Sequence, residues 1–444
     1  MPYTSLSKRD IKIMLDKLQL SNIDDLFNIV SDKFKVDFSK FDLPKSFSEQ
    51  EILNHMSKIS DLNSSHKNLC FIGGGAYDHY VPKVVDFLSS RSEFYTAYTP
   101  YQPEVSQGTL QYLYEFQTMI CELSGMDIAN ASLYDGASAV AEACSMAISS
   151  NKKNKILLSS TLNPNYINVV KTYFSTNNIN LELIQNKSGV IDCNNLSEKI
   201  DKNTSCIVVQ SPNCNGLLED WEKIVKDKKY EDILVIAVSD PMSLSLIKTP
   251  YDCGCDVYVG EGQSLGNYLS FGGPYIGLFS TLSKYARKIP GRIIGRTDDV
   301  DGKEGFVMTL QTREQHIRRD RATSNICTNQ GLLALRSTIY MSLLGKDGLP
   351  EIAEICFQNA QYAAKKLNEI KGFSLHYNNR EFLKEFVLKI PFSASKFIID
   401  ARAKGFSLSG LPEDCTDSLL LLAFTEKRTK EDIDRLVDFF KNYN

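Results

Sequence analysis

The sequence has no long hydrophobic run. Its longest apolar stretches, near Ile233 and Leu419, are far shorter than the roughly 20 apolar residues that a membrane-spanning helix needs. Its first residues, MPYTSLSKRDIKIMLDKL, lack the apolar core of a signal peptide. We therefore expect no membrane as a partner.

Excess charge of either sign and paired cysteines are also missing. A net charge of -4 over 444 residues gives no reason to expect nucleic acid as a partner. The 11 cysteines contain no CxxC pair, and the one close pair, Cys253 and Cys255, has no histidine nearby, so we expect no metal site. Scattered cysteines are typical of a reduced protein, which predicts a cytoplasmic location.

The most informative absence is that of a lysine in one glycine-rich turn. The apolar run Ile233–Val238 predicts a strand buried on both faces, and Asp240 follows it directly. A second short strand, at Cys255–Val259, leads into the turn Gly260-Glu-Gly-Gln-Ser264. An acid at one strand end and a special turn at the next are typical of a cofactor site at the open edge of an α/β sheet.

In pyridoxal-phosphate enzymes of the aspartate-aminotransferase-like class, such an acid pairs with the pyridine nitrogen, and a lysine on the next turn forms the Schiff base. No lysine occurs here from Thr249 to Ser283, and Gln263 stands where the lysine is expected. An amide cannot form an aldimine. The stretch therefore predicts the scaffold of a cofactor enzyme without its reactive group.

A second feature argues against a phosphate bound by this chain. The stretch Asn130–Ser149 reads as a turn followed by a helix of small residues, and free N–H groups at such a helix start bind anions. Asp135 lies at the expected N-cap, where its own carboxylate can accept from those groups. A phosphate there would bring two anions together.

The alternation of strands and helices predicts the fold class. Strands at Lys155–Ser160, Cys206–Asn213 and Ile233–Val238, with helices between them, indicate a mainly parallel α/β sheet. We expect an aspartate-aminotransferase-like large domain over 63–330, a helical N-terminal arm over 1–62 and a small α+β domain over 331–444. In the arm, Thr4 is a candidate N-cap before a helix at 7–18, and Ser48 with Glu51 has capping-box spacing. The arm packs either on a partner subunit or on the chain's own core.

Two segments with distinctive side chains are candidates for function. His79, in CFIGGGAYDHYVP, is either a proton carrier or a hydrogen-bonded structural residue. Tyr95, Tyr98 and Tyr101 recur in a loop that also carries Glu104 and two prolines. Rigid amphipathic loops of this composition suit a partner surface or a substrate pocket, and a packed surface loop is the alternative.

The stretch Gly291–Asn325 is basic and irregular, and Arg313, Arg318, Arg319 and Arg321 are its densest positive cluster. The cluster binds either an anionic ligand or a partner carboxylate, or it is a solvated, salt-bridged turn.

Four motifs together resemble one family, the glycine decarboxylase P-protein, in its N-terminal half or in subunit 1 of its two-subunit form. They are PYQPEVSQG at 100–108, NASLYDGASA at 130–139, GEGQSLG with FGGP at 260–274, and LQTREQHIRRDRATSNICT at 310–328. The similarity covers nearly the whole chain. Around Asn163-Pro-Asn-Tyr166 the sequence departs from the family's usual His-Pro, which puts a role for a histidine there in doubt.

The resemblance implies a subunit of the glycine cleavage system, which decarboxylates glycine and passes its aminomethyl group to the lipoyl arm of H-protein. Pyridoxal phosphate and its lysine are then expected on subunit 2, in a heterotetramer. The contacts that this chain would lend to substrate or interface are Tyr95, Tyr98, Tyr101, Glu104, His79, Arg318, Arg319, Thr323, Ser324 and Asn325.

Two alternatives stay open at this point. An autonomous pyridoxal-phosphate enzyme needs another lysine, and Lys248 and Lys284 are the nearest ones to the turn. A structural or regulatory pseudoenzyme of the same fold needs none.

Overall fold

The computed structural model describes residues 6–37, 40–63, 67–411 and 417–443. The chain divides into two compact units, residues 1–64 and residues 65–444, and each is described by itself.

The first unit contains only helices among its described residues: α1 (Lys8–Leu18), the 3₁₀ helices η1 (Ile23–Phe27) and η2 (Asp32–Phe34), and α2 (Glu49–Asp61). The cap of α1 is Ser7, which forms a capping box with Asp10, whereas Thr4 lies outside the described residues. The predicted capping box of Ser48 and Glu51 is confirmed. Neither α1 nor α2 buries a side chain, although both carry large apolar residues.

A seven-stranded sheet organises the described part of the second unit, in the order β2-β10-β9-β8-β7-β3-β4. Its strands are β2 (Ile128–Ala129), β3 (Lys155–Ser159), β4 (Asn180–Ile184), β7 (Thr204–Gln210), β8 (Leu234–Val238), β9 (Val257–Glu261) and β10 (Gly277–Thr281). Within this sheet the five neighbouring strands β9, β8, β7, β3 and β4 pair in parallel. Strand β10 pairs antiparallel with both β9 and β2. The buried strand predicted at Ile233–Val238 is confirmed as β8.

The apolar runs form strands because both faces of the sheet are covered. Along β8, Val235 and Ala237 join one hydrophobic core, whereas Leu234, Ile236 and Val238 join the other. Period-two alternation therefore divides one continuous apolar run between two cores.

Helices supply the two cores. The core that contains Leu234 is shared with α6 (Gly136–Asn151) and α7 (Pro164–Phe174), and the opposite core is shared with α5 (Gln107–Ser124), α8 (Cys193–Lys199) and α9 (Trp221–Asp227). Helix α5 ends before Gly125, which adopts the left-handed φ of 73° that closes a helix. No described helix is both long enough and apolar enough to cross a bilayer.

Shorter elements connect this frame. They are α3 (Lys83–Ser89), α4 (Ser92–Tyr95), η5 (Pro103–Val105), η6 (Ser243–Ser245) and η7 (Ser283–Tyr285), with the small strands β1 (Leu69–Cys70), β5 (Asn186–Lys187) and β6 (Val190–Ile191).

The basic stretch is more regular than the sequence suggested. Strands β11 (Ile293–Asp298) and β12 (Glu304–Thr309) form an antiparallel hairpin, followed by η8 (Gln311–Arg313), α10 (Gln315–Arg318) and η9 (Arg319–Arg321). The signal for the hairpin is Asp301-Gly302, in which Gly302 has a φ of 77°.

A third core belongs to the C-terminal part. Helix α11 (Gly331–Asn368) begins in the core shared with α5, breaks its helical dihedrals at Gly345 and continues into the third core. There it meets a sheet in the order β13-β14-β17-β16 and two further helices. These elements are β13 (Ser374–Leu375), β14 (Glu385–Lys389), α12 (Ala394–Ala403), β15 (Phe406–Ser407), β16 (Ser409–Gly410), β17 (Leu419–Ala423) and α13 (Lys430–Lys441).

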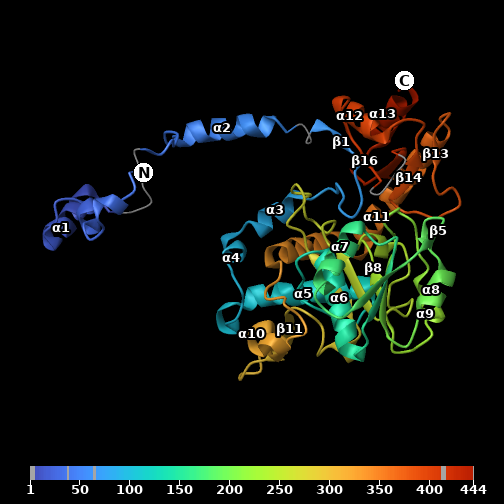
Figure 1. Ribbon diagram of the computed structural model, residues 1–444, viewed down its shortest axis with the longest axis horizontal. Helices are drawn as coiled ribbons and strands as arrows, with labels where there is room; N and C mark the ends of the chain where they lie inside the picture. Colours follow the sequence, from blue (N-terminus) through green and yellow to red (C-terminus); the bar gives the residue numbers. More distant parts are fainter. Residues whose placement is uncertain (1–5, 38–39, 64–66, 412–416, 444) are drawn as a thin grey trace. The chain divides into compact units, whose positions relative to one another are not determined.

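Figure 1 shows α12, α13, β13 and β14 grouped at one end of the second unit, away from α5, α10 and β11. Because α11 takes part in two cores, the domain boundary expected at 330/331 stays a prediction.

Candidate functional site

Asp240 lies directly after β8, at the carboxyl edge of the parallel sheet, as the sequence predicted. Its carboxylate faces a lysine: Oδ2 lies 2.8 Å from Nζ of Lys384. Ser264 Oγ donates to Oδ1 at 2.9 Å, and Ser243 Oγ donates to Oδ2 at 3.1 Å. The acid that a pyridine nitrogen would use is therefore already paired within the chain.

Lys384 reaches this position from the residue before β14, in the C-terminal part. Its ammonium group lies 3.6 Å from the centre of the Tyr77 ring and 3.1 Å from His79 Nε2. Burial alone would raise the pKa of Asp240, but the charge and hydrogen bond of Lys384 hold that pKa below its ordinary value. The charged form of the Asp240 carboxylate is consequently stabilised by its contact with Lys384.

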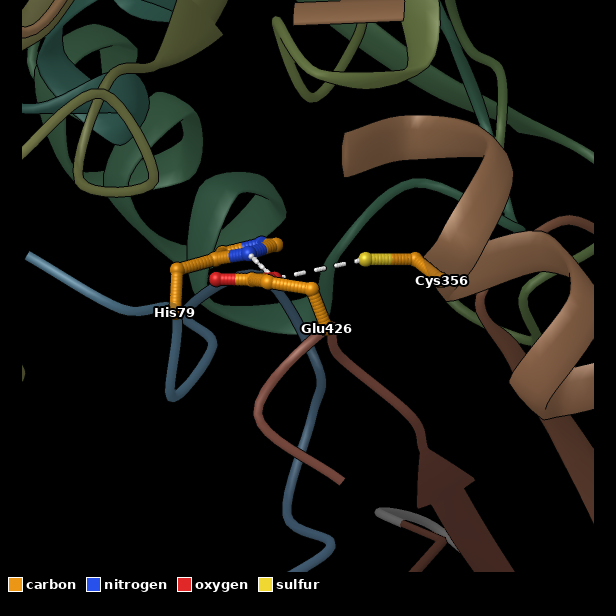
Figure 2. Close-up of side chains that lie close together, drawn as sticks. All are labelled: His79, Cys356 and Glu426. Atoms are coloured by element: carbon orange, nitrogen blue, oxygen red, sulfur yellow. Dashed lines mark hydrogen bonds and ion pairs between the residues drawn. The ribbon is translucent and has the colours of Figure 1, made fainter. Parts of the chain in front are cut away.

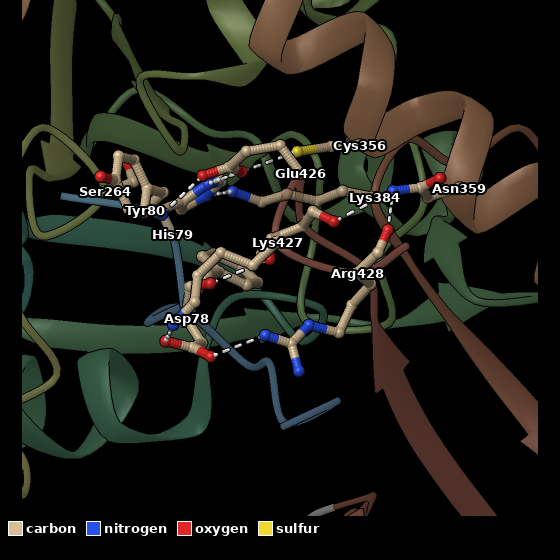
Figure 3. A network of polar contacts seen from close by, with 12 residues as sticks. Asp78, His79, Tyr80, Ser264, Cys356, Asn359, Lys384, Glu426, Lys427 and Arg428 are labelled. Atoms are coloured by element: carbon tan, nitrogen blue, oxygen red, sulfur yellow. Dashed lines mark hydrogen bonds and ion pairs between the residues drawn. The ribbon is translucent and has the colours of Figure 1, made fainter. Parts of the chain in front are cut away.

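His79 is buried and continues the network on its other side (Figure 3). Its Nδ1 lies 2.7 Å from Glu426 Oε2, while Glu426 Oε1 accepts from the Tyr80 amide at 2.6 Å. Because the Lys384 ammonium can only donate, Nε2 of His79 accepts and Nδ1 donates to Glu426. The structure thus places His79 between two charged side chains, inside the second unit.

Glu426, His79 and Cys356 could offer ligands to a metal ion, since their ligand atoms lie within 4.8 Å of one another. Figure 2 shows Glu426 between the other two, with Cys356 on α11, and the thiol lies 3.5 Å from Glu426 Oε2. The ammonium of Lys384, 3.1 Å from the imidazole, would repel a divalent cation. We therefore assign the cluster as a hydrogen-bond network.

Gln263 is also buried, and its amide is fully engaged with the backbone. Its Oε1 accepts from the Tyr77 amide at 2.8 Å, and its Nε2 donates to the carbonyls of Tyr77 and Asn267 at 3.1 Å and 2.8 Å. The side chain thereby ties the glycine-rich turn to the segment around Tyr77, a role that a lysine could not copy because it has no acceptor.

The start of α6, where a phosphate would bind, is occupied by two carboxyl groups. Asp135 is the N-cap, as predicted, and accepts from the Ser138 amide at 2.7 Å. Glu261 accepts from the Gly136 amide at 3.0 Å and from the amides of Gln263 and Ile276, each at 3.1 Å.

Glu261 is unusually situated for a carboxyl group. Burial raises its pKa to about 8, and the nearby charge of Asp135 adds to this effect, although the three backbone amides oppose it. A phosphate group would have to displace one of these two carboxyl groups and lie beside the other.

Little room remains between these groups. The cavity lined by Tyr77, Tyr166, Asp240, Glu261 and Lys384 has a volume of about 20 Å³, which is about the space that one water molecule needs. Pyridoxal phosphate does not fit this set of residues. The acid that would pair with its ring nitrogen, Asp240, is already paired with Lys384, the helix start that would hold its phosphate carries two acidic side chains, and the cavity is too small for its ring.

The lysines named by the autonomous alternative lie elsewhere. Lys248 Nζ pairs with Glu222 at 3.1 Å and Lys284 Nζ with Asp256 at 3.3 Å, both with exposed side chains. Lys384 does reach Asp240, but a Schiff-base lysine attaches at the opposite side of the pyridine ring from the nitrogen. Direct contact with the acid is therefore incompatible with that role.

The tyrosine loop lies away from this cavity, at the surface. Tyr98 is 86% exposed, Tyr95 and Glu104 are also exposed, and Tyr101 is about half exposed. The Tyr101 hydroxyl accepts a hydrogen bond from Arg292 at 3.1 Å. Arg292 is buried, and the sequence analysis did not single it out.

The basic cluster divides between interior and surface. Arg313 donates to the carbonyls of Leu310 and Gly291 at 3.0 Å and 2.9 Å and also contacts the carbonyl of Ile289, so it holds the backbone before β11. The remaining candidates of this stretch are exposed, apart from the half-buried Ser324: Arg318, Arg319, Arg321, Thr323 and Asn325. The structure does not bring them to Asp240, and their roles stay predictions.

Comparison with known proteins gives one consistent result. The family model described as glycine cleavage system P-protein matches residues 1–440. The chain is 45% identical to the probable glycine dehydrogenase (decarboxylating) subunit 1 of Desulforamulus reducens, over 98% of this chain and 97% of the relative. It is 43% identical to the protein of the same name from Chloroherpeton thalassium, over 99% of both chains.

Solved structures agree. A crystal structure of glycine decarboxylase (P-protein) of the glycine cleavage system, in inhibitor-bound form, matches with a TM-score of 0.91 and 36% identity over 99% of both chains. Glutamate decarboxylase of Lactobacillus brevis matches with a TM-score of 0.67 at 14% identity, over 92% of this chain and 97% of that one, and so shows the fold alone. The predicted fold class is confirmed.

Proposed function

The chain belongs to the glycine cleavage system P-protein family, as its motifs predicted, and from this membership we propose its function. It is subunit 1 of a glycine dehydrogenase (decarboxylating). Together with a second subunit it decarboxylates glycine and transfers the aminomethyl group to the lipoyl arm of H-protein. Full-length similarity to relatives that carry this name supports the assignment.

We further propose that pyridoxal phosphate is bound on subunit 2 and not on this chain. The observation that carries this proposal is the Lys384–Asp240 ion pair, at 2.8 Å, together with the two carboxylates at the start of α6. When bound to its own subunit, pyridoxal phosphate supplies the electron sink for decarboxylation. This chain supplies a rigid fold and surface groups near that site.

The surfaces offered to subunit 2 are the arm and the tyrosine loop. Helices α1 and α2 expose Ile13, Leu18, Leu53 and Met56, apolar side chains that a partner would cover. We propose that the arm and loop together bury more than roughly 2,000 Å² against subunit 2, in a heterotetramer with two copies of each chain. We also propose a cytoplasmic location, supported by free thiols at all the described cysteines.

Co-purification of this chain with its subunit 2 tests these proposals. A stable complex that exchanges the carboxyl carbon of glycine with bicarbonate when lipoylated H-protein is present is the expected result, with each chain alone as control. Monomers that do not associate at micromolar concentration, or exchange by this chain alone, would contradict the assignment.

A further inference from the structure

The tyrosine loop is anchored at both ends by side-chain contacts. Before it, the Phe94 ring packs edge-on against Tyr112 with centroids 5.9 Å apart. After it, Gln107 exchanges hydrogen bonds with the Phe306 backbone, at 2.9 Å and 2.8 Å. Between these anchors the loop lines a cavity of about 130 Å³, and Pro100 is the buried residue of its middle, so side-chain packing fixes its shape at few points there.

A single buried guanidinium spans this gap. Arg292 lies just before β11, and its side chain is 4% exposed. Its Nη1 donates to Thr99 Oγ1 at 3.3 Å and to Asn329 Oδ1 at 3.2 Å, while its Nη2 donates to the Tyr101 hydroxyl at 3.1 Å. The guanidinium also lies 5.3 Å from the centre of the Tyr101 ring, in cation–π range.

The charge of this arginine is balanced inside the same cluster. Glu314, which is also buried, places Oε2 4.0 Å from Arg292 Nε. His316 Nδ1 lies 3.5 Å from the same oxygen, and the His316 ring meets the Tyr101 ring edge-on at 6.2 Å. The loop and the basic stretch, which the sequence presented as separate candidates, are thus joined through Arg292.

We propose that Arg292 is the positioning residue that fixes the tyrosine loop in the shape with which it meets the site on subunit 2. Its planar fork reaches the loop, Asn329 and Glu314 at once, which the single ammonium of a lysine cannot do. The inference rests on the proposed function, because it gives the loop a place near the glycine site.

The first test does not depend on activity. Backbone hydrogen exchange of residues 94–106 is measured in the two-chain complex for wild type, Arg292→Lys, Arg292→Met and, as matched control, Arg296→Met. Arg296 lies on the same strand β11, with a side chain 61% exposed. Exchange in the loop should rise at least about tenfold in both Arg292 variants and stay unchanged in the control. Unchanged exchange in both Arg292 variants would overturn the proposal.

The second test separates positioning from stability. Glycine–bicarbonate exchange, expressed per bound cofactor, should lose about 10- to 100-fold in kcat in Arg292→Met, with KM for glycine within about threefold, because a displaced loop misplaces its contacts. Tyr101→Phe should lower kcat by a smaller factor. Adding Tyr101→Phe to Arg292→Met should lower kcat no further, because both changes remove the same contact between Arg292 and the Tyr101 hydroxyl. A merely structural Arg292 would lower the yield of complex and leave kcat per cofactor unchanged, which would overturn the proposal.

The two failures are distinguishable. A wild-type complex that does not exchange glycine would refute the proposed function. Faster hydrogen exchange in the loop of the Arg292 variants would still support the positioning role of Arg292. If Arg292→Met does not assemble, Arg292→Lys and Tyr101→Phe decide the question with the same two readouts.

Discussion

Replacing Lys384 with methionine removes the ammonium group that faces Asp240 and keeps most of the volume of the side chain. The change leaves a buried carboxylate with only the hydroxyls of Ser243 and Ser264 as donors. Breaking a buried ion pair on one side costs about 3–5 kcal/mol, because the remaining charge stays desolvated. Asp240→Asn should cost a similar amount, because the buried ammonium of Lys384 then loses its counter-charge.

The double variant Asp240→Asn/Lys384→Met should recover part of this loss. With both charges gone, no uncompensated ion remains, so the two single changes should be non-additive by about 2 kcal/mol or more. The assay is urea unfolding of the full chain, followed by the fluorescence of its one tryptophan, Trp221, which is buried beside β7.

A surface pair provides the control for this cycle. Lys248 pairs with Glu222 at 3.1 Å, but both side chains are exposed, so Lys248→Met should change the free energy of unfolding by less than about 1 kcal/mol. Additive effects at Asp240 and Lys384, or single changes as mild as the control, would refute the assignment of these two residues as a coupled, buried ion pair.

The remaining predictions concern pH and the surface groups. Since the folded state raises the pKa of Glu261 to about 8 from an ordinary value of 4.5, the stability that its proton provides is complete below pH 4.5 and lost as the pH rises through 8. Relative to wild type, the free energy of unfolding of Glu261→Gln should therefore rise by on the order of 4 kcal/mol between pH 5 and pH 9, and a pH-independent difference in urea unfolding would contradict this. If Tyr98 and Arg318 reach the site on subunit 2, Tyr98→Phe and Arg318→Lys should each lower glycine exchange about 30- to 1,000-fold in an intact complex. Tyr230→Phe, at an exposed tyrosine outside the loop, is the control, and wild-type rates in all three would leave this chain as scaffold.

The parts of the fold that local sequence determines were predictable. The capping box of Ser48 and Glu51, the Asp135 cap and the end of α5 at Gly125 each depend on residues within a few positions of one another. The strand β8 was predictable because an unbroken apolar run needs cover on both faces.

The pairing within the candidate site was not predictable in the same way. His79 and Lys384 are 305 residues apart, and nothing in the sequence around Lys384 marks it as the partner of Asp240. Arg292 escaped notice because it precedes the dense arginine cluster and its function depends on the loop that folds over it. Contacts of this kind follow from tertiary packing, which periodicity and local motifs do not encode.

The central claim is that this chain retains the cofactor-enzyme fold but leaves pyridoxal phosphate to subunit 2. Borohydride reduction of the two-chain complex in the presence of pyridoxal phosphate, followed by mass spectrometry of each chain, tests it most directly. We predict an adduct on subunit 2 alone, and none on this chain even as Gln263→Lys, because Asp135, Glu261 and the Lys384–Asp240 pair remain. A reducible adduct on a lysine of the wild-type chain would contradict the account.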